Sequence, residues 1–112
     1  MNETPIDARE ALVVLITAPP DRAAGLARQL VEEQLIGCAN VISGVRSIYR
    51  WKGEICDDAE CLLVCKTTRA RLDLLKWRVG ELHPYEAPEV LPVGVDAGAE
   101  KYLAWLFGSV AP

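Results

Sequence analysis

The sequence predicts an α+β domain in which four antiparallel strands form one sheet and helices cover one face of it. Two observations favour this class. Strand-like and helix-like segments follow one another in the order β-α-β-β-α-β, with one more helical segment at the end. No repeat, linker or low-complexity segment interrupts the 112 residues, a length that suits one domain over residues 11–112.

The first two elements are a buried strand and an amphipathic helix. Residues 11–17 (ALVVLIT) form an apolar run rich in β-branched side chains, which is typical of a strand covered on both faces. Pro19-Pro20 ends this strand, and Asp21 is a candidate N-cap for a helix that ends before Gly37. The apolar stripe of this helix has the spacing of one helix face and consists of Ala23, Leu26, Ala27, Leu30 and Val31.

A long β-hairpin is expected next. A strand over residues 39–53 has a bulge or bend at Ser43-Gly44, and a turn at Gly53-Glu54 leads to a returning strand over 60–67. The first of these strands would span about 50 Å at ~3.3 Å per residue, although typical strands have only about 5–6 residues. We therefore expect the hairpin to project and to pair with another copy, the alternative being a hairpin folded back on its own domain. Tyr49 and Trp51 near its tip suit an interface between subunits.

The last elements complete a ferredoxin-like pattern. A second helix is expected over residues 69–82, with Thr68 as a candidate cap and Pro84 preventing its continuation. A strand over 88–95 contains Pro92 and so belongs at a sheet edge or carries a bulge, and a short helix over 100–107 follows. The order is the split βαβ arrangement plus a C-terminal helix, with two helices on one face of the sheet.

Charge and hydropathy limit the classes of partner. The net charge is −4 and the isoelectric point about 5.0, so the basic footprint of a nucleic-acid-binding protein is missing. No apolar run reaches the length of a membrane span. Residues 1–10 are polar, which predicts a loose tail rather than a signal peptide, and we therefore expect a cytoplasmic protein.

The four cysteines do not form a zinc motif. Cys61 and Cys65 are expected on one strand, about 13 Å apart, which is too far for a disulfide between them. There is no Cys-x-x-Cys pair and only one histidine, so a tetrahedral zinc site within one chain is not expected. We interpret Cys38, Cys56, Cys61 and Cys65 as small apolar residues.

Five segments resemble the CutA family of divalent-ion tolerance proteins, in order and in spacing. They are VLITAPP (14–20), CANVISGVRSIYRWKG (38–53), LVCKTT (63–68), LHPYEAP (82–88) and YLAWL (102–106). This resemblance implies a ferredoxin-like fold, a homotrimer held by strand exchange at the long hairpins, and binding of divalent metal, notably copper. One departure concerns copper, because some family members have a cysteine, implicated as a copper ligand, where this chain has Ile16.

His83 and Glu86 are the candidate metal ligands. Imidazole is a good ligand for Cu(II), and Glu86 follows three residues later, while a neighbouring subunit would supply the remaining ligands. Alternatively, His83 caps the last carbonyl groups of the second helix.

A pocket between subunits is the second candidate site. Lys66 shares a strand face with Glu60 and needs either water, an anionic ligand or a carboxylate partner such as Glu60 or Glu89. Tyr85, Trp51 and Trp105 either pack in the core and the interface or wall this pocket together with Glu86. Asp57, Asp58 and Glu60 form an acidic patch that either binds a hard cation, does acid–base work or is a solvated flank of the hairpin.

Three classes of function compete. The first is a non-catalytic trimer that binds divalent cations, and the second is a regulatory module resembling PII proteins that binds a small anionic ligand between subunits. The third is an enzyme such as an acylphosphatase, which needs a phosphate-binding loop after the first strand. Pro19, Pro20 and Asp21 disfavour that loop, since two backbone donors are missing and a carboxylate opposes phosphate. We therefore expect the first class, and no enzyme.

Overall fold

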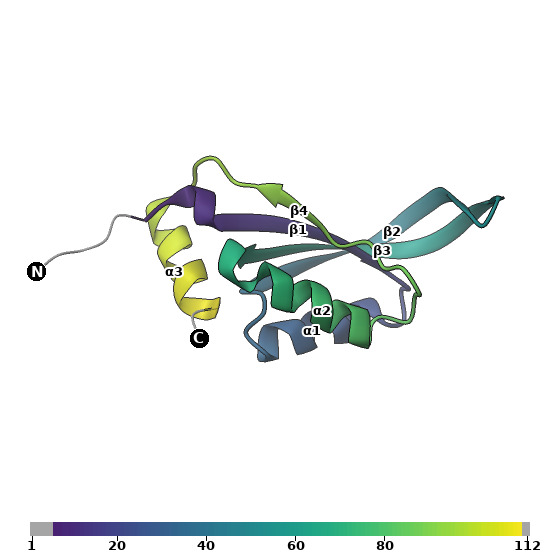
Figure 1. The fold of residues 1–112 in the computed structure, drawn as a ribbon, viewed down its shortest axis with the longest axis horizontal. Helices are drawn as coiled ribbons and strands as arrows, with labels where there is room; N and C mark the ends of the chain where they lie inside the picture. Colours follow the sequence, from purple (N-terminus) through teal and green to yellow (C-terminus); the bar gives the residue numbers. More distant parts are fainter. Residues whose placement is uncertain (1–5, 111–112) are drawn as a thin grey trace, which may run out of the picture.

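The structure is a computed structural model that describes residues 6–110 as one antiparallel sheet with its helices on one side and at one end (Figure 1). The strands are β1 (Ala11–Ala18), β2 (Cys38–Trp51), β3 (Glu54–Thr68) and β4 (Leu91–Gly94), in the spatial order β2-β3-β1-β4. The helices are α1 (Ala23–Glu32), α2 (Leu72–Leu82) and α3 (Glu100–Val110), with short 3-10 turns at Ala8–Glu10 and Arg69–Arg71. This is the predicted ferredoxin-like α+β class.

The main core lies between the sheet and helices α1 and α2. Because successive strand residues point to opposite faces, Leu12, Val14 and Ile16 of β1 all point toward the helices and are buried. They pack with apolar side chains of α1 and α2, including Leu30, Leu75 and Val79. A smaller cluster at the other end joins α3 to the start of β1 through Ala11, Leu103 and Leu106.

The opposite face of the sheet carries no helix within the described subunit (Figure 1). Its side chains are largely apolar. In the strand register, Leu15 lies between Val64 and Leu91, and Val13 lies between Lys66 and Val93. Leu91 and Val93 are about half exposed, and so is Ile42 on β2. The prediction that the first strand is covered on both faces therefore holds for one face of the single subunit, and the other face is only half-buried.

The β2–β3 hairpin projects from the body of the domain. The molecule measures 58 × 25 × 22 Å, with a radius of gyration of 15.2 Å, compared with about 13 Å for a compact domain of this length. Gly44 has a φ of 76° at a register shift between Ile42 and Val45, which confirms the predicted bulge. Lys52 and Gly53 both have positive φ and form a two-residue turn, so the turn lies one residue earlier than expected.

Several element ends differ from the sequence prediction. β3 begins at Glu54 instead of residue 60, since the two-residue turn lets pairing start at once. β4 is confined to Leu91–Gly94, where it pairs with β1 as an edge strand that accommodates Pro92. Helix α2 begins at Leu72 after a 3-10 turn, and among the described residues no N-cap side chain bonds to the start of α1 or α2.

The predicted N-terminal tail is partly structured. Residues 1–5 lie outside the described residues, but Asp7 caps the 3-10 turn Ala8–Glu10, and Ile6 and Ala8 pack against the small cluster around α3. The expectation of a loose tail is therefore wrong for residues 6–10, because two apolar side chains find partners on α3. None of the helices between residues 6 and 110 is long and apolar enough to cross a membrane.

Candidate functional site

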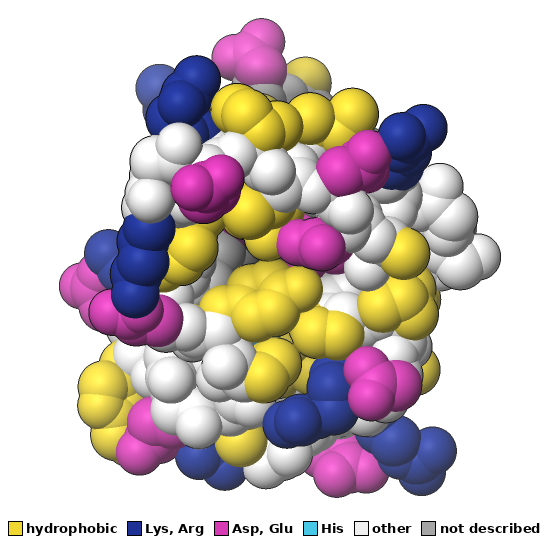
Figure 2. Space-filling view, turned by 90° about the vertical axis from the view of Figure 1, so that its right-hand side faces the viewer, with side chains coloured by type: hydrophobic (Ala, Val, Ile, Leu, Met, Phe, Trp, Pro, Cys, Tyr) yellow, Lys and Arg dark blue, Asp and Glu magenta, His cyan; other side chains and the backbone are white. Residues whose placement is uncertain are grey.

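A cavity of about 490 Å³ lies where the hairpin leaves the body of the domain. The end of β1, one face of the hairpin and the loop between α2 and β4 all contribute to it. Its lining includes Thr17, Ser47, Ile48, Tyr49, Trp51, Glu60, Tyr85, Glu86, Ala87 and Glu89. Viewed from the hairpin end, hydrophobic side chains gather at the centre of the molecule, with acidic side chains beside them (Figure 2).

Glu60 and Tyr85 form a hydrogen-bonded pair at this cavity. The Tyr85 hydroxyl donates to Oε2 of Glu60 over 2.8 Å, and only 5% of Glu60 is exposed. Burial, together with this carboxylate, raises the pKa of Tyr85 to about 12. Tyr85 therefore stays a hydrogen-bond donor over the whole neutral range and holds the Glu60 carboxylate in place.

His83 is buried, and both of its ring nitrogens are used inside the subunit. Nδ1 accepts a hydrogen bond from the backbone N–H of Tyr85 over 3.1 Å, and Nε2 lies 2.7 Å from the carbonyl oxygen of Thr17. A carbonyl only accepts, so the ring carries its proton on Nε2. No lone pair is left for a metal, and the expected ligand role of His83 does not fit this geometry. Its imidazole also does not cap α2 but bonds to the end of β1 instead.

The tip of the hairpin curves toward the loop that carries Glu86. The Lys52 ammonium lies 3.6 Å from a carboxylate oxygen of Glu86 and 5.7 Å from the centre of the Trp51 ring. On the same hairpin face, the Tyr49 hydroxyl donates to Asp58, which raises the pKa of Tyr49. The hairpin thus projects and at the same time forms one wall of the cavity.

Residues 6–110 of one subunit do not form a metal site by themselves. Among the described residues, no group of three or more His, Cys, Asp or Glu side chains is arranged to hold an ion. Glu60, Glu86 and Glu89 bring carboxylates to the cavity, but other ligands would have to come from outside the subunit. Ile16, at which the resemblance to the CutA family raised the question of a copper-binding cysteine, points into the main core and is fully buried, so this position does not face the cavity.

Two of the predicted pocket residues lie elsewhere. Lys66 lies at the other end of β3, opposite Cys38 and Val13, and donates to the Asn40 side chain rather than to Glu60 or Glu89. Trp105 lies on α3 with its ring 5.5 Å from that of Tyr102. The sequence prediction placed Lys66 and Trp105 in the pocket from the face of a strand and the order of motifs. Neither of these gives the distance between residues along the sheet.

The acidic patch divides into separate interactions. Asp57 forms an ion pair with Arg46 over 2.7 Å, which lowers the pKa of Asp57, and Asp58 accepts from Tyr49. Glu60 alone is buried at the cavity. These three carboxylates therefore do not act as one cluster.

All four cysteines are free thiols. Cys61 and Cys65 are buried, and Cys38 and Cys56 are half-buried. Burial raises the pKa of Cys65 to about 12, whereas Cys38 lies 3.6 Å from the Tyr102 hydroxyl. None of the four lines the cavity.

Sequence reasoning missed several residues of this site. Thr17, Ser47 and Ala87 line the cavity, Glu89 lies there instead of bonding to Lys66, and Lys52 lies beside its mouth. The signal for Ala87 and Glu89 was available, because both lie within three residues after the HPYE segment. Thr17 and Ser47 carried no signal, since only the end of β1 and the curvature of the hairpin bring them there.

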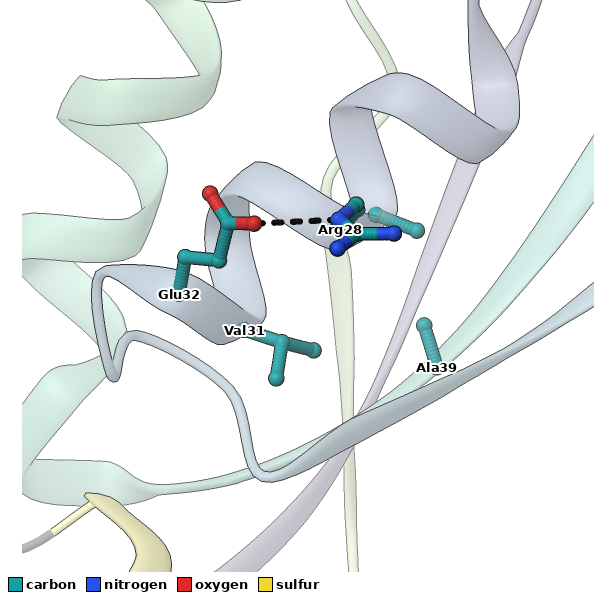
Figure 3. A pocket seen from close by; sticks show the side chains of 5 residues that line it. Arg28, Val31, Glu32 and Ala39 are labelled. Carbon is teal, nitrogen blue, oxygen red and sulfur yellow. Dashed lines mark hydrogen bonds and ion pairs between the residues drawn. The ribbon is translucent and has the colours of Figure 1, made fainter.

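A second hollow of about 400 Å³ lies between α1 and the start of β2. Figure 3 shows Val31 and Ala39 on its two sides, with Arg28 bonded to Glu32 over 3.0 Å. The charged groups here already satisfy each other, and both are exposed to solvent. We assign no function to this hollow.

Comparisons with known proteins place the chain among divalent-ion tolerance proteins. The family model described as "CutA1 divalent ion tolerance protein" matches residues 12–109. The Divalent-cation tolerance protein CutA of Thermus thermophilus is 47% identical over 95 residues, which cover 84% of this chain and 92% of that protein. The solved structure of the PII-like protein CutA from Nostoc is 40% identical with a TM-score of 0.84, and the match covers 88% of this chain and 96% of that one.

Two further relatives correct the expected location. A relative from Arabidopsis thaliana named "Protein CutA, chloroplastic" is 40% identical over 88% of this chain and 55% of its own length. A solved structure from Archaeoglobus fulgidus, named a periplasmic divalent cation tolerance protein, is 26% identical with a TM-score of 0.85 over 89% of this chain and 98% of that one. Proteins of this kind occur in compartments other than the cytoplasm, so the cytoplasmic assignment is not supported. The polar start of the chain was an insufficient reason for it.

Proposed function

This chain belongs to the CutA1 divalent ion tolerance family, and from that premise we propose that it is a homotrimer that binds divalent cations without catalysis. The acidic cavity beside the hairpin is the proposed cation site. The observation that carries this proposal is the buried carboxylate of Glu60, which opens onto a cavity with Glu86 and Glu89.

Self-association is supported by the open sheet face. Apolar side chains from all four strands lie on that face, and several of them are about half exposed in the single subunit. Ile48 and Ile55 near the hairpin tip are more exposed still, at 64% each. An exposed apolar patch of this kind marks an interaction surface, and a small domain gains core volume by covering it with further copies.

The ligand chemistry favours cations bound by oxygen. Carboxylates suit Mg²⁺, Ca²⁺ and Mn²⁺, whereas copper prefers imidazole or sulfur, and His83 has no free nitrogen for it. We therefore propose Glu60 and Glu86 as cation ligands, with the remaining ligands supplied by a neighbouring subunit or by water. Copper would bind at this site only through oxygen.

A PII-like regulatory module is the second candidate. It is supported by the Nostoc relative, which is named PII-like at 40% identity and with a TM-score of 0.84. A small anionic ligand in the cavity is disfavoured, because three carboxylates line it and none of the described lining residues is lysine or arginine.

The net charge of −4 likewise speaks against nucleic acid as a partner.

The oligomeric state and cation binding can be tested together. Size-exclusion chromatography with light scattering is expected to give about three times the chain mass of 12.3 kDa. Calorimetric titration of the same sample with Mn²⁺ and with Cu²⁺ is expected to show binding that Glu60→Gln and Glu86→Gln each weaken. Glu32→Gln, on the far side of α1, is the matched control and should leave binding unchanged.

Two results would overturn this proposal. A particle with the mass of a monomer at micromolar concentration would contradict the proposed trimer. If Glu60→Gln and Glu86→Gln bind the cations as tightly as the wild type does, the cavity is not the cation site.

A further inference from the structure

The walls of the cavity combine aromatic rings with carboxylates. Tyr49, Trp51 and Tyr85 supply the rings, and Glu60, Glu86 and Glu89 supply the acids. A bare metal ion makes no use of aromatic walls, whereas an ammonium or guanidinium group is attracted both to a ring face and to a carboxylate. The cavity volume of about 490 Å³ falls within the range of about 300–1,000 Å³ found for small-molecule sites.

Glu60 is a buried acid without a cationic partner among residues 6–110. It takes part in no ion pair among the described residues, and its one hydrogen bond comes from the neutral hydroxyl of Tyr85 to Oε2. Oε1 receives no hydrogen bond from any described residue, and because no buried side-chain oxygen among these residues lacks a partner, Oε1 is open to the cavity. A positive group that enters the cavity can therefore reach this oxygen and pair with the carboxylate.

The chain itself already places an ammonium group at the mouth of this cavity. Lys52 lies 3.6 Å from Glu86 and 5.7 Å from the centre of the Trp51 ring, so one acid and one ring act on the same amine. The Lys52 side chain is 71% exposed, however, and pairs with none of the buried groups. The contacts of Lys52 thus show an ammonium group held beside both a carboxylate and an aromatic ring of this cavity. The more deeply buried carboxylate of Glu60 has no such partner among the described residues.

We propose that this cavity binds a small organic cation, a primary ammonium or guanidinium group on a short apolar chain. The charged end pairs with Oε1 of Glu60, and the apolar chain lies against the rings of Tyr85 and Trp51. This inference deepens the proposed function and rests on it, because it uses the same cavity and the same Glu60 carboxylate as the proposed cation site.

Fluorescence of Trp51 provides a direct test. Trp77→Phe and Trp105→Phe, both outside the cavity, leave Trp51 as the single tryptophan of the full chain. Butylammonium and butylguanidinium are titrated at neutral pH, with butanol as the neutral probe of equal chain length and butyrate as the anionic one. We expect at least one of the two cations to bind at least about tenfold more tightly than butanol, and butyrate to bind less tightly than either cation.

Matched variants test which side chains bind the organic cation. Glu60→Gln keeps an acceptor for Tyr85 but removes the charge, and it is expected to lower cation affinity at least about tenfold, while Glu32→Gln leaves affinity unchanged. Lys52→Gln should raise affinity, because it removes an ammonium that competes for Glu86 and Trp51.

Three results would overturn the inference: equal binding of butanol and both cations, full cation affinity in Glu60→Gln, or a fall in affinity in Lys52→Gln. Any of these results, together with a trimeric wild type whose Mn²⁺ binding is weakened by Glu60→Gln, would leave the proposed function standing.

Discussion

Tyr85 connects the buried polar side chains of the candidate site. Its hydroxyl bonds to Glu60, its backbone N–H bonds to His83, and its ring lies 4.6 Å from the imidazole. His83 in turn bonds to the end of β1 through Thr17. Through these contacts the loop after α2 is fixed to the sheet, which sets the shape of the cavity.

Stability at high pH is expected to depend on Tyr85. The pKa of its hydroxyl is raised from 10.0 to about 12, so between these values the unfolded chain loses a proton that the folded chain keeps. The stabilisation is complete below about pH 10 and is lost as the pH rises toward 12. Urea unfolding across this range is therefore expected to show a falling free energy of unfolding.

Replacing Tyr85 by phenylalanine tests that assignment. Tyr85→Phe should lower stability at neutral pH by about 1–3 kcal/mol, because Glu60 loses its donor, and it should flatten the decline above pH 10. Tyr49, Tyr102 and Cys65 also have raised pKa values and will preserve part of the decline. Parallel wild-type and variant profiles would contradict the role given to Tyr85.

Thiol reactivity is expected to follow burial along the chain. Cys65 is buried with a pKa raised to about 12, and Cys61 is buried beside it in the core, so neither should react with an aromatic disulfide reagent in the folded protein. Cys38 and Cys56 are half-buried and should react first. Mass spectrometry of the labelled native protein checks the order, and early labelling of Cys65 would contradict it.

At the scale of elements, the close contact between α3 and the loop before β2 can be tested at Gly37. A Cβ atom at this position would lie 2.6 Å from Cδ1 of Leu106 and 3.6 Å from Trp105. Leu106 is fully buried in the small cluster, so it has little room to move. Gly37→Ala is expected to destabilise the protein by about 1–3 kcal/mol, measured by urea unfolding.

Gly25 provides the matched control for that substitution. It lies in α1, and a Cβ atom there would meet nothing within 4 Å. Gly25→Ala should therefore leave stability unchanged or raise it by up to about 1 kcal/mol through helix propensity. Equal effects at the two glycines would show that α3 does not pack as closely as the structure indicates.

At the scale of the whole molecule, the open sheet face should decide assembly. Ile42 and Leu91 are about half exposed in the single subunit, so a lysine at either position costs the isolated subunit little. In the proposed trimer the same lysine would be desolvated. Ile42→Lys and Leu91→Lys are expected to give monomers that keep their circular dichroism spectrum, as shown by light scattering.

Leu74 on the outer side of α2 is the control for this experiment. It is 45% exposed, as Ile42 is, but it does not lie on the open face. Leu74→Lys should leave the particle mass unchanged. A trimer in Ile42→Lys and Leu91→Lys would place the contact between copies elsewhere.

The sequence by itself determined the fold class, most element positions and the family. Period-2 and period-3.6 apolar patterns are local signals, so β1, α1 and the Gly44 bulge were predictable from neighbouring residues. Glu60, Glu86, Tyr85 and Trp51 were predicted to line a pocket between subunits; the structure brings all four to one cavity of the single subunit, and the contribution of a neighbouring subunit stays a prediction.

Only the tertiary structure decided which polar groups are free. His83 was a reasonable metal ligand by residue type, but the end of β1 and the backbone of Tyr85 take both nitrogens. Lys66 and Trp105 were placed far from the cavity by the register of β3 and by the packing of α3. Such partners come from segments distant in sequence, and a hydrogen bond between them forms only when donor and acceptor lie about 2.7–3.2 Å apart, which no local pattern encodes.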